Sequence, residues 1–404
     1  MPPTPGKQGP QQGGPGAAPG GQARGLPTSD VLVVGAGVIG LACAWRAAQR
    51  GMSVCVIDRH APGSGTSRVA AGMLAPVGEA SWGEESLLEL NLASASAYPR
   101  FAAELEEAAG SGIDYRRHGA LHVALDRDEE EELRRRHRYQ EGMGLETEWI
   151  GPWRCRELEP GLATACSAGV HAREDASVDP RALVDALVLA AERAGVTVIP
   201  NAEAAAALIE SDRLRGVRTA DGRVLRAGQV VLACGPWSGR PDWLPAGVVP
   251  PVRPVKGQVL YLRGNRAHPL CERIVATQRV YVAPRGDGRI VVGATVEEQS
   301  FDTTVTAGAA HELLRECCRV LPEAAELELL EVVAGLRPAT PDNSPVIGRG
   351  ALDGLVLATG HFRNGILLTP ITADAVAALL SGDEPPGPVA PMALERLGPP
   401  ASRR

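Results

Sequence analysis

One stretch near the N-terminus, residues 30–58, limits the folds open to this chain more than any other. It reads DVLVVGAGVIGLACAWRAAQRGMSVCVID. Residues 30–34 form an apolar run typical of a strand, and Gly35, Gly37 and Gly40 follow in the spacing G-x-G-x-x-G. Residues 41–50 form an alanine-rich helical stretch. A second β-branched run, 53–57, is followed by the acidic residue Asp58. This order predicts a strand, a tight turn, a helix and a second strand, which together form a unit that binds dinucleotides.

Each part of this unit has a physical task. Gly35 permits the tight turn, Gly37 lets the backbone approach a pyrophosphate, and Gly40 lets the helix pack closely on the strand. The N-terminus of the helix offers unpaired N–H groups and a partial positive charge to the phosphates. Asp58 follows the glycines by about 20 positions, where a carboxylate binds the ribose. The pattern indicates a dinucleotide but does not say which one.

Length and composition restrict the class of protein. A chain of 404 residues that is 44% hydrophobic is expected to be globular, with two domains. The net charge of −7 and the pI near 5.7 argue against a nucleic-acid partner, which requires a clustered excess of Lys and Arg. The eight cysteines form no C-x-x-C pair and no Cys/His group at metal spacing, which predicts reduced thiols in a cytoplasmic protein without a metal site. His118 and His122 lie in a strand-like stretch and are not expected to be ligands.

The two ends of the chain differ from the rest. Residues 1–27 are mostly Pro, Gly and Gln, too polar to offset chain entropy by burial, and we expect a disordered tail without a secretory signal. Residues 386–404 are expected to form a flexible C-terminal tail. Residues 31–48 are apolar, but their glycines and Arg46 favour a buried strand and helix over a membrane span, so no stable membrane insertion is expected.

The middle of the chain indicates one sheet built from distant segments. Residues 230–239 and 354–365 each read as a buried strand that enters a glycine turn, as residues 30–40 do. A long FAD molecule, gripped along its length, needs such an arrangement, and a nicotinamide cofactor rarely does. Further strands are expected at 119–125, 252–262, 280–284 and 289–295, the last three in a second sheet, and helices at 84–109, 128–142, 180–195 and 366–380.

We therefore expect an α/β fold with a discontinuous Rossmann-type FAD-binding domain and an α+β substrate domain built on an antiparallel sheet. The expected bounds are 28–85, 152–240 and 335–385 for the FAD-binding domain, and 86–151 and 241–334 for the substrate-binding domain.

From about residue 30 to residue 380 the chain resembles the D-amino-acid oxidase superfamily of flavoenzymes, and within it the glycine oxidases of thiamine biosynthesis. The resemblance rests on five motifs in the right order: TSRVAAGMLAP from Thr66, PVKGQ from Pro254, YVAPRGDGRIVVGAT from Tyr281, GLRPATPDNSPVIGR from Gly335 and GHFRNGILLTP from Gly360.

The resemblance implies roles for three residues at the substrate. Arg337, in GLRP, would bind the substrate carboxylate, because a planar guanidinium matches a carboxylate with two donors. Tyr281, which opens YVAPR, would donate a second hydrogen bond to the same carboxylate. Arg363, in GHFRNG, would reach the active site near the substrate. Arg279 stands two residues before Tyr281, where some glycine oxidases have His, which leaves the size and preference of the pocket open.

The resemblance also implies the FAD contacts. Related sarcosine oxidases attach the flavin to a Cys where this chain has Gly335 and carry a Lys where it has Val291, so we expect non-covalent FAD. The residues implied at the cofactor are Gly35, Gly37, Val38, Ile39, Gly40, Asp58, Arg59, Thr66, Ser67, Ala71, Gly72, Met73, Ala204, His361, Phe362, Arg363, Asn364, Gly365, Ile366 and Leu367.

The implied activity is oxidative deamination of glycine, and of sarcosine or small D-amino acids, with O2 as the electron acceptor and a homotetramer as the assembly. Three alternatives remain at this point. A D-amino-acid dehydrogenase would pass electrons to quinone, an NAD-dependent dehydrogenase would hold no flavin, and a non-catalytic flavin-binding protein would bind FAD without oxidising an amine.

Overall fold

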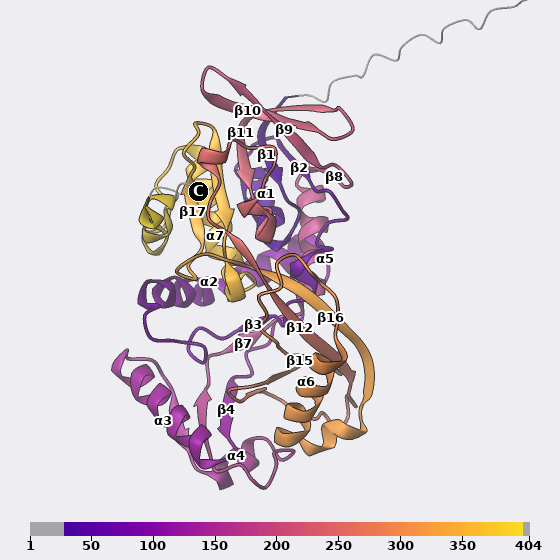
Figure 1. The fold of residues 1–404 in the computed structure, drawn as a ribbon, viewed down its shortest axis with the longest axis vertical. Helices are drawn as coiled ribbons and strands as arrows, with labels where there is room; N and C mark the ends of the chain where they lie inside the picture. Colours follow the sequence, from indigo (N-terminus) through magenta and orange to yellow (C-terminus); the bar gives the residue numbers. More distant parts are fainter. Residues whose placement is uncertain (1–27, 399–404) are drawn as a thin grey trace, which may run out of the picture.

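The computed structural model describes residues 28–398 and arranges them in two lobes stacked along the long axis of the molecule (Figure 1). Residues 1–27, for which we expect a disordered tail, lie outside the described residues. One lobe is built on an eight-stranded sheet with a parallel core, and the other on a second eight-stranded sheet that is almost wholly antiparallel. The predicted fold class, an α/β domain joined to an antiparallel-sheet domain, is confirmed.

The first sheet collects strands from distant parts of the chain. Its parallel core has the order β18-β11-β1-β2-β8, and β17 pairs antiparallel with β18 at one edge. Val31 of β1 lies opposite Gln229 of β11, and Val230 lies opposite Leu355 of β18, which confirms that the three segments with glycine turns share one sheet. The strands are β1 (Ser29–Val34), β2 (Val54–Ile57), β8 (Thr197–Ile199), β9 (Ala204–Glu210), β10 (Arg213–Thr219), β11 (Val224–Leu232), β17 (Val346–Arg349) and β18 (Leu355–Thr359).

Four helices belong to the lobe of this sheet, of which α1 and α7 contact the strands while α2 and α5 pack on other helices: α1 (Val38–Gln49), α2 (Glu85–Ala109), α5 (Pro180–Arg193) and α7 (Thr369–Ser381). α5 begins as predicted, with the Asp179 side chain accepting a hydrogen bond from Arg181 N at 2.8 Å and Pro180 in the first turn. α7 begins at Thr369, three residues later than expected, after a short 3-10 turn at Phe362–Asn364.

The position of α2 differs from the expected domain bounds, which placed residues 86–109 with the substrate domain. Leu90, Phe101 and Leu105 of α2 are buried in the same apolar core as Val33 and Trp45. The apolar stripe of α2 therefore completes the core between α1, α5 and α7, and the helix belongs to the lobe of the first sheet.

The second sheet has the strand order β16-β12-β15-β14-β13-β4-β6-β5, and only β13 and β4 run parallel. Residues 152–172, expected in the FAD-binding domain, lie here instead, because β6 pairs along its length with β4. The elements of this lobe are β4 (Ala120–Ala124), β5 (Glu148–Ile150), β6 (Ala168–Ala172), β12 (Arg253–Arg263), β13 (Ile274–Ala276), β14 (Tyr281–Pro284), β15 (Arg289–Gly293), β16 (Glu328–Ala339), α3 (Arg127–Gly142), α4 (Pro152–Leu158) and α6 (Ala307–Val320). A two-stranded sheet of β3 (Met73–Leu74) and β7 (Ala176–Ser177) lies between the lobes (Figure 1).

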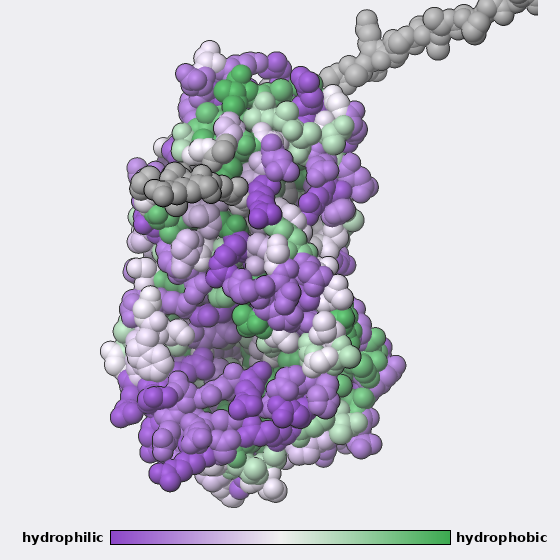
Figure 2. All heavy atoms as spheres, in the orientation of Figure 1, coloured by the Kyte–Doolittle hydropathy of each residue, from purple (hydrophilic) through white to green (hydrophobic). Residues whose placement is uncertain are grey.

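Charged side chains cover α3, as its sequence predicts. Asp126 caps the helix by accepting a hydrogen bond from Glu129 N at 3.0 Å, and acidic residues fill the first turn, where they complement the helix dipole. In Figure 2 this part of the molecule forms a continuous hydrophilic surface.

The C-terminal segment packs against the lobe of the first sheet up to residue 398, contrary to the flexible tail expected over 386–404, of which residues 399–404 lie outside the described residues. Residues 387–397 form short 3-10 turns, and Val389 and Met392 are buried in the core that contains α1 and α7. No helix within residues 28–398 has the length and apolar character needed to cross a membrane.

Candidate active site

A cavity of about 500 Å³ opens at the carboxyl edge of the first sheet. Val34, Ile57 and Thr359 line it from the ends of β1, β2 and β18, which is where open α/β sheets bind their ligands. Thirteen of the residues implied at the cofactor line this one cavity: Gly35, Gly37, Val38, Ile39, Asp58, Arg59, Thr66, Ser67, Ala204, His361, Phe362, Gly365 and Ile366.

The glycine turn has the geometry that its spacing predicts. Gly35 has φ +111°, and a Cβ there would lie 2.4 Å from the Ala233 carbonyl oxygen. A Cβ on Gly40 would lie 1.9 Å from the Gly35 carbonyl oxygen, so α1 and β1 can approach only because position 40 has no side chain. The first turn of α1 holds no acidic residue, and its Val38 N–H donates to Ser67 Oγ at 3.0 Å. The positive end of this helix therefore faces the cavity with hydroxyl and N–H groups, which suit a pyrophosphate.

Asp58 and Arg59 lie next to the glycine turn, at the end of β2. One Asp58 oxygen accepts a hydrogen bond from Ala36 N at 2.8 Å and the other from His60 N at 2.9 Å, which fixes the carboxylate at the end of β2. The Arg59 guanidinium stacks 4.1 Å from the ring centre of Trp237. This end of the cavity offers a fixed acceptor to a ribose and a cation beside it.

Sequence reasoning missed an aromatic wall of the cavity. The rings of Trp237 and Phe301 stack with their centres 6.1 Å apart, and Arg240 lies over Phe301. Trp237 follows the glycine turn after β11, and the motif GPWSG was a signal for it. Phe301 comes from a loop of the second lobe that no local pattern connects to the cavity.

The other implied cofactor residues lie outside the lining of this cavity. Ala71 and Met73 join Tyr281 in an apolar cluster on the second sheet, next to Val69. Gly72 has φ +68°, and a Cβ there would meet the Val178 carbonyl oxygen at 2.0 Å. The other implied cofactor residues that do not line the cavity are Gly40, Arg363, Asn364 and Leu367.

Tyr281 and Arg337 lie over two glycines of the second sheet. A Cβ on Gly257 would lie 2.4 Å from Arg337 Nη1, and a Cβ on Gly293 would lie 2.3 Å from the Tyr281 hydroxyl oxygen. Gly293 is the cross-strand partner of Tyr281, and β12 and β15 separate the two polar residues in the sheet. The absence of side chains at these two positions lets both polar groups lie flat on the same sheet.

The charge of Arg337 has no carboxylate partner within residues 28–398. Arg337 Nη1 donates to the carbonyl oxygens of Thr295 at 3.0 Å and of Lys256 at 3.4 Å, and both acceptors are neutral. Burial raises the pKa of Tyr281 to about 12, while the nearby Arg337 acts to lower it. Tyr281 therefore keeps its proton at neutral pH and is a hydrogen-bond donor beside a free cation.

Glu79 is a further charged group near this site that the sequence did not single out. It is half-buried in the loop after β3. Burial raises the pKa of its carboxyl, and Arg363, Arg136 and Arg337 oppose that rise. Arg136 from α3 donates to the Gly78 carbonyl oxygen, which joins this loop to the second lobe.

Arg363 already has a partner. Its Nη2 forms an ion pair with Glu84 at 2.6 Å, and Glu84 also accepts from Asn343 Nδ2 at 3.0 Å. The side chain is about one-third exposed. Arg363 thus lies at the rim of the site, near Glu79, and is bound to an acidic residue of the loop before α2.

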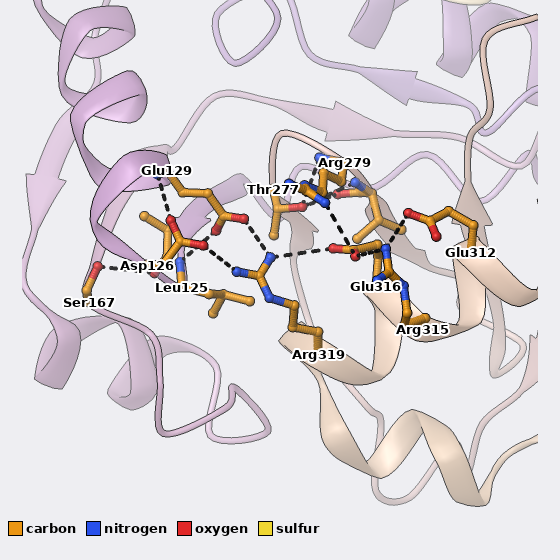
Figure 3. A network of polar contacts seen from close by, with 12 residues as sticks. Leu125, Asp126, Glu129, Ser167, Thr277, Arg279, Glu312, Arg315, Glu316 and Arg319 are labelled. Atoms are coloured by element: carbon orange, nitrogen blue, oxygen red, sulfur yellow. Dashed lines mark hydrogen bonds and ion pairs between the residues drawn. The ribbon is translucent and has the colours of Figure 1, made fainter.

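Arg279 points toward α6 (Figure 3). Its Nη1 lies 3.9 Å from Glu316, a buried carboxylate that also pairs with Arg315 at 2.9 Å. Arg319 continues this network by pairing with Asp126 of the α3 cap at 2.7 Å (Figure 3). Arg279 therefore belongs to a polar network between α3 and α6.

Asp175 and His122 are buried beside Gly78 on the inner side of the loop that carries Glu79. Asp175 accepts hydrogen bonds from Gly78 N at 2.9 Å and Val77 N at 3.3 Å. Burial nevertheless raises the pKa of Asp175 to about 8 and lowers that of His122 to about 3. At neutral pH both groups are therefore mainly neutral in the folded protein.

The free energy of unfolding is expected to fall between pH 6.5 and 8, and Asp175→Asn is expected to reduce this fall. In this range folded Asp175 holds a proton that the unfolded chain, with an ordinary pKa of 3.8, has released. Stability is then lost as pH rises toward 8, by up to about 1.4 kcal/mol per unit. His122 acts at lower pH, because its depressed pKa costs stability only as pH falls below 6.5.

Thermal melts at pH 6.5 and 8 measure this difference, with the exposed Asp128→Asn as a control. If the melting temperature of the wild type falls between pH 6.5 and 8 by no more than that of Asp175→Asn, the assignment of Asp175 as a protonated buried carboxyl is contradicted.

Comparison with known proteins identifies the family. The sequence model of the FAD dependent oxidoreductase (DAO) family matches residues 30–379. The chain belongs to this family. It is 34% identical to a glycine oxidase of Geobacillus kaustophilus, over 91% of this chain and 97% of that protein. The crystal structure of glycine oxidase from the same organism superimposes with a TM-score of 0.86 at 33% identity, covering 91% of this chain and 99% of that one.

A second kind of relative is longer than this chain. The chain is 35% identical, over 87% of its length, to the bifunctional protein ThiO/ThiG of Trichormus variabilis, and spans about half (52%) of that protein. FAD is the cofactor of the family and of this chain. The residues that line the cavity fit this cofactor. The glycine turn and the N-terminus of α1 suit its pyrophosphate, and Asp58 suits its ribose.

Proposed function

We propose that this FAD-dependent oxidoreductase oxidises glycine, and also sarcosine or small D-amino acids, with O2 as the acceptor. For glycine the balance is glycine, O2 and water giving glyoxylate, ammonia and hydrogen peroxide. The observation that carries the proposal is the pair of Arg337 and Tyr281 over two glycines, where a guanidinium without a carboxylate partner lies beside a protonated hydroxyl.

The residues of the chain would bind and orient the substrate. Arg337 would bind the carboxylate through two N–H groups, and Tyr281 would donate a further hydrogen bond to it. The apolar cluster of Val69, Ala71 and Met73 would exclude water from the reacting carbon. FAD, when bound without a covalent link, supplies the two-electron oxidation, so the contribution of the protein is binding and orientation.

No side-chain base is required if the substrate amine is neutral when it reacts. His361 is no candidate for a base, because its Nε2 is hydrogen-bonded to Thr372 Oγ1 at 3.0 Å and burial lowers the pKa of the ring to about 3. The similarity to glycine oxidase and to ThiO/ThiG supports a role for the product in thiamine biosynthesis. A cytoplasmic homotetramer is part of the same proposal.

Replacement of Tyr281 by Phe is expected to raise the KM for glycine by about 10-fold to 100-fold, because a hydrogen bond to a charged group is lost. The effect on kcat should be smaller, since the same bond is made before and during the reaction. Oxygen consumption at varied glycine concentration measures both constants. Tyr115→Phe, outside the site, is the matched control, and equal KM values for the two variants would remove Tyr281 from the site.

The proposed activity itself is tested by measuring oxygen uptake, glyoxylate and ammonia after addition of glycine to the FAD-loaded protein. We expect equal amounts of oxygen consumed and glyoxylate formed. Oxidation of glycine that requires an added quinone and consumes no oxygen would instead identify a dehydrogenase. Bound FAD without any glyoxylate would identify a non-catalytic flavin protein.

A further inference from the structure

A second cavity of about 520 Å³ lies within the antiparallel lobe and shares no lining residue with the cofactor cavity. It is bounded by the segment before β4, the loop after β12, the segment before β13 and the turn between β14 and β15. Its lining includes six arginines and a histidine: Arg116, Arg117, His118, Arg266, Arg273, Arg285 and Arg289. Glu272 is the one carboxylate of the lining, so the cavity has a strong excess of positive charge.

Half of these arginines are already neutralised by acidic residues outside the cavity. Ion pairs join Arg117 to Glu174, Arg273 to Glu159 at 3.2 Å, and Arg289 to Asp179. Within residues 28–398 no ion pair joins Arg116, Arg266 or Arg285 to a carboxylate. Three guanidinium groups thus share a concave site, and none of them is in a direct ion pair with a carboxylate of the described residues.

Arg285 gives the strongest indication of a ligand. It is only 4% exposed, yet one of its terminal nitrogens, Nη1, has no hydrogen-bond partner. The other terminal nitrogen, Nη2, donates to the carbonyl oxygen of Ala71. A buried guanidinium without a paired anion is costly, since its lost hydration must be replaced by another charge or acceptor. Arg285 is not among the residues that line the cofactor cavity.

The lining also includes apolar side chains. Leu270, Cys271 and Ile290 line it and are each at most 6% exposed. Cationic and apolar groups in one concavity suit a small molecule with an anionic group on a carbon body. Its volume is that of an ordinary small-molecule site, and the net charge of −7 for the whole chain argues against a nucleic acid.

We propose that this cavity binds a small molecule that carries a phosphate or diphosphate group. Several forked guanidinium donors around one space match the oxygens of a phosphate, and Arg is favoured where such planar recognition matters. The hydrogen bond from Arg285 to Ala71 connects the cavity to the TSRVAAGM loop, next to the substrate site. An anion bound in this cavity would compete with the Ala71 carbonyl for the Arg285 guanidinium. It would thereby change the position of the TSRVAAGM loop.

Calorimetric titration of the FAD-saturated protein with inorganic pyrophosphate and with inorganic phosphate tests the proposal. We expect saturable binding at one site that weakens as salt is raised. Arg116→Gln and Arg266→Gln should each weaken pyrophosphate binding about tenfold or more, because each removes a charged hydrogen bond. Arg263→Gln is the matched control, since Arg263 is an exposed arginine of β12 outside the cavity, and it should bind as the wild type does.

Absence of binding, or binding that Arg116→Gln and Arg266→Gln leave unchanged, would overturn the proposal. Citrate in a parallel titration separates phosphate from carboxylate recognition, and tighter binding of citrate than of pyrophosphate would overturn the phosphate assignment. The titration measures binding and needs no turnover. Failure of glycine oxidation therefore leaves the result of this test unaffected.

Discussion

Arg337→Leu is expected to raise the KM for glycine by about 30-fold to several thousand-fold, the effect of 2 to 5 kcal/mol lost when one partner of a buried charge pair is removed. The reason lies in the surroundings of Arg337. Its guanidinium lies over Gly257, donates to two neutral carbonyls and has no carboxylate partner within residues 28–398. A substrate carboxylate would fill that role, and leucine offers it no donor.

Steady-state oxygen consumption measures this effect, and Arg253→Leu provides a matched control. Arg253 lies on the adjacent strand β12, about half exposed, and pairs with Glu298 outside the site. A KM for glycine in Arg337→Leu that stays close to that of Arg253→Leu would exclude Arg337 from substrate binding.

Gly40→Val is expected to abolish retention of FAD during purification and to lower the free energy of unfolding by about 1 to 3 kcal/mol or more. A Cβ at this position would lie 1.9 Å from the Gly35 carbonyl oxygen. Backbone atoms cannot rotate away as a side chain can, so α1 must move from β1, and its N-terminus moves away from the pyrophosphate position.

The flavin absorbance of the purified protein and its thermal melting measure the two effects of Gly40→Val. Gly308→Val is the control, because Gly308 lies in the first turn of α6 with nothing within 4 Å of the added Cβ. A yellow Gly40→Val protein with the melting temperature of the control would show that close packing at position 40 is not required.

The dinucleotide-binding unit could be predicted because its information is local. The strand, the glycine turn and the helix are consecutive, and α1 was expected at 41–50 and lies at Val38–Gln49. Asp58 follows at a fixed distance along the chain, so its place at the end of β2 also follows from the sequence. Local periodicity and turn chemistry determine such elements before any tertiary contact is known.

The division between the lobes could not be predicted from local patterns. The apolar stripe of α2 shows that one face is buried but not against which sheet, and the helix packs with α5 and α7. Likewise, β6 pairs with β4 across the intervening residues 125–167. These positions depend on which surfaces remain uncovered once the whole chain has folded.

The substrate site was predicted only in part, for the same reason. The resemblance to the superfamily pointed to Arg337 and Tyr281, but the two glycines beneath them, Gly257 and Gly293, become visible only through strand register. The ion pair of Arg363 with Glu84 joins residues 279 positions apart, and no spacing rule connects them.

The most direct test of this account is an anaerobic titration of the FAD-loaded protein with glycine, followed through the flavin absorbance band. We expect glycine to bleach the band of the wild-type protein to completion. We also expect Arg337→Leu, loaded with the same amount of FAD, to require at least about 30-fold more glycine for half of the effect. A flavin band that glycine leaves unchanged, or a half-saturating glycine concentration that is equal in the two proteins, would contradict the proposed function.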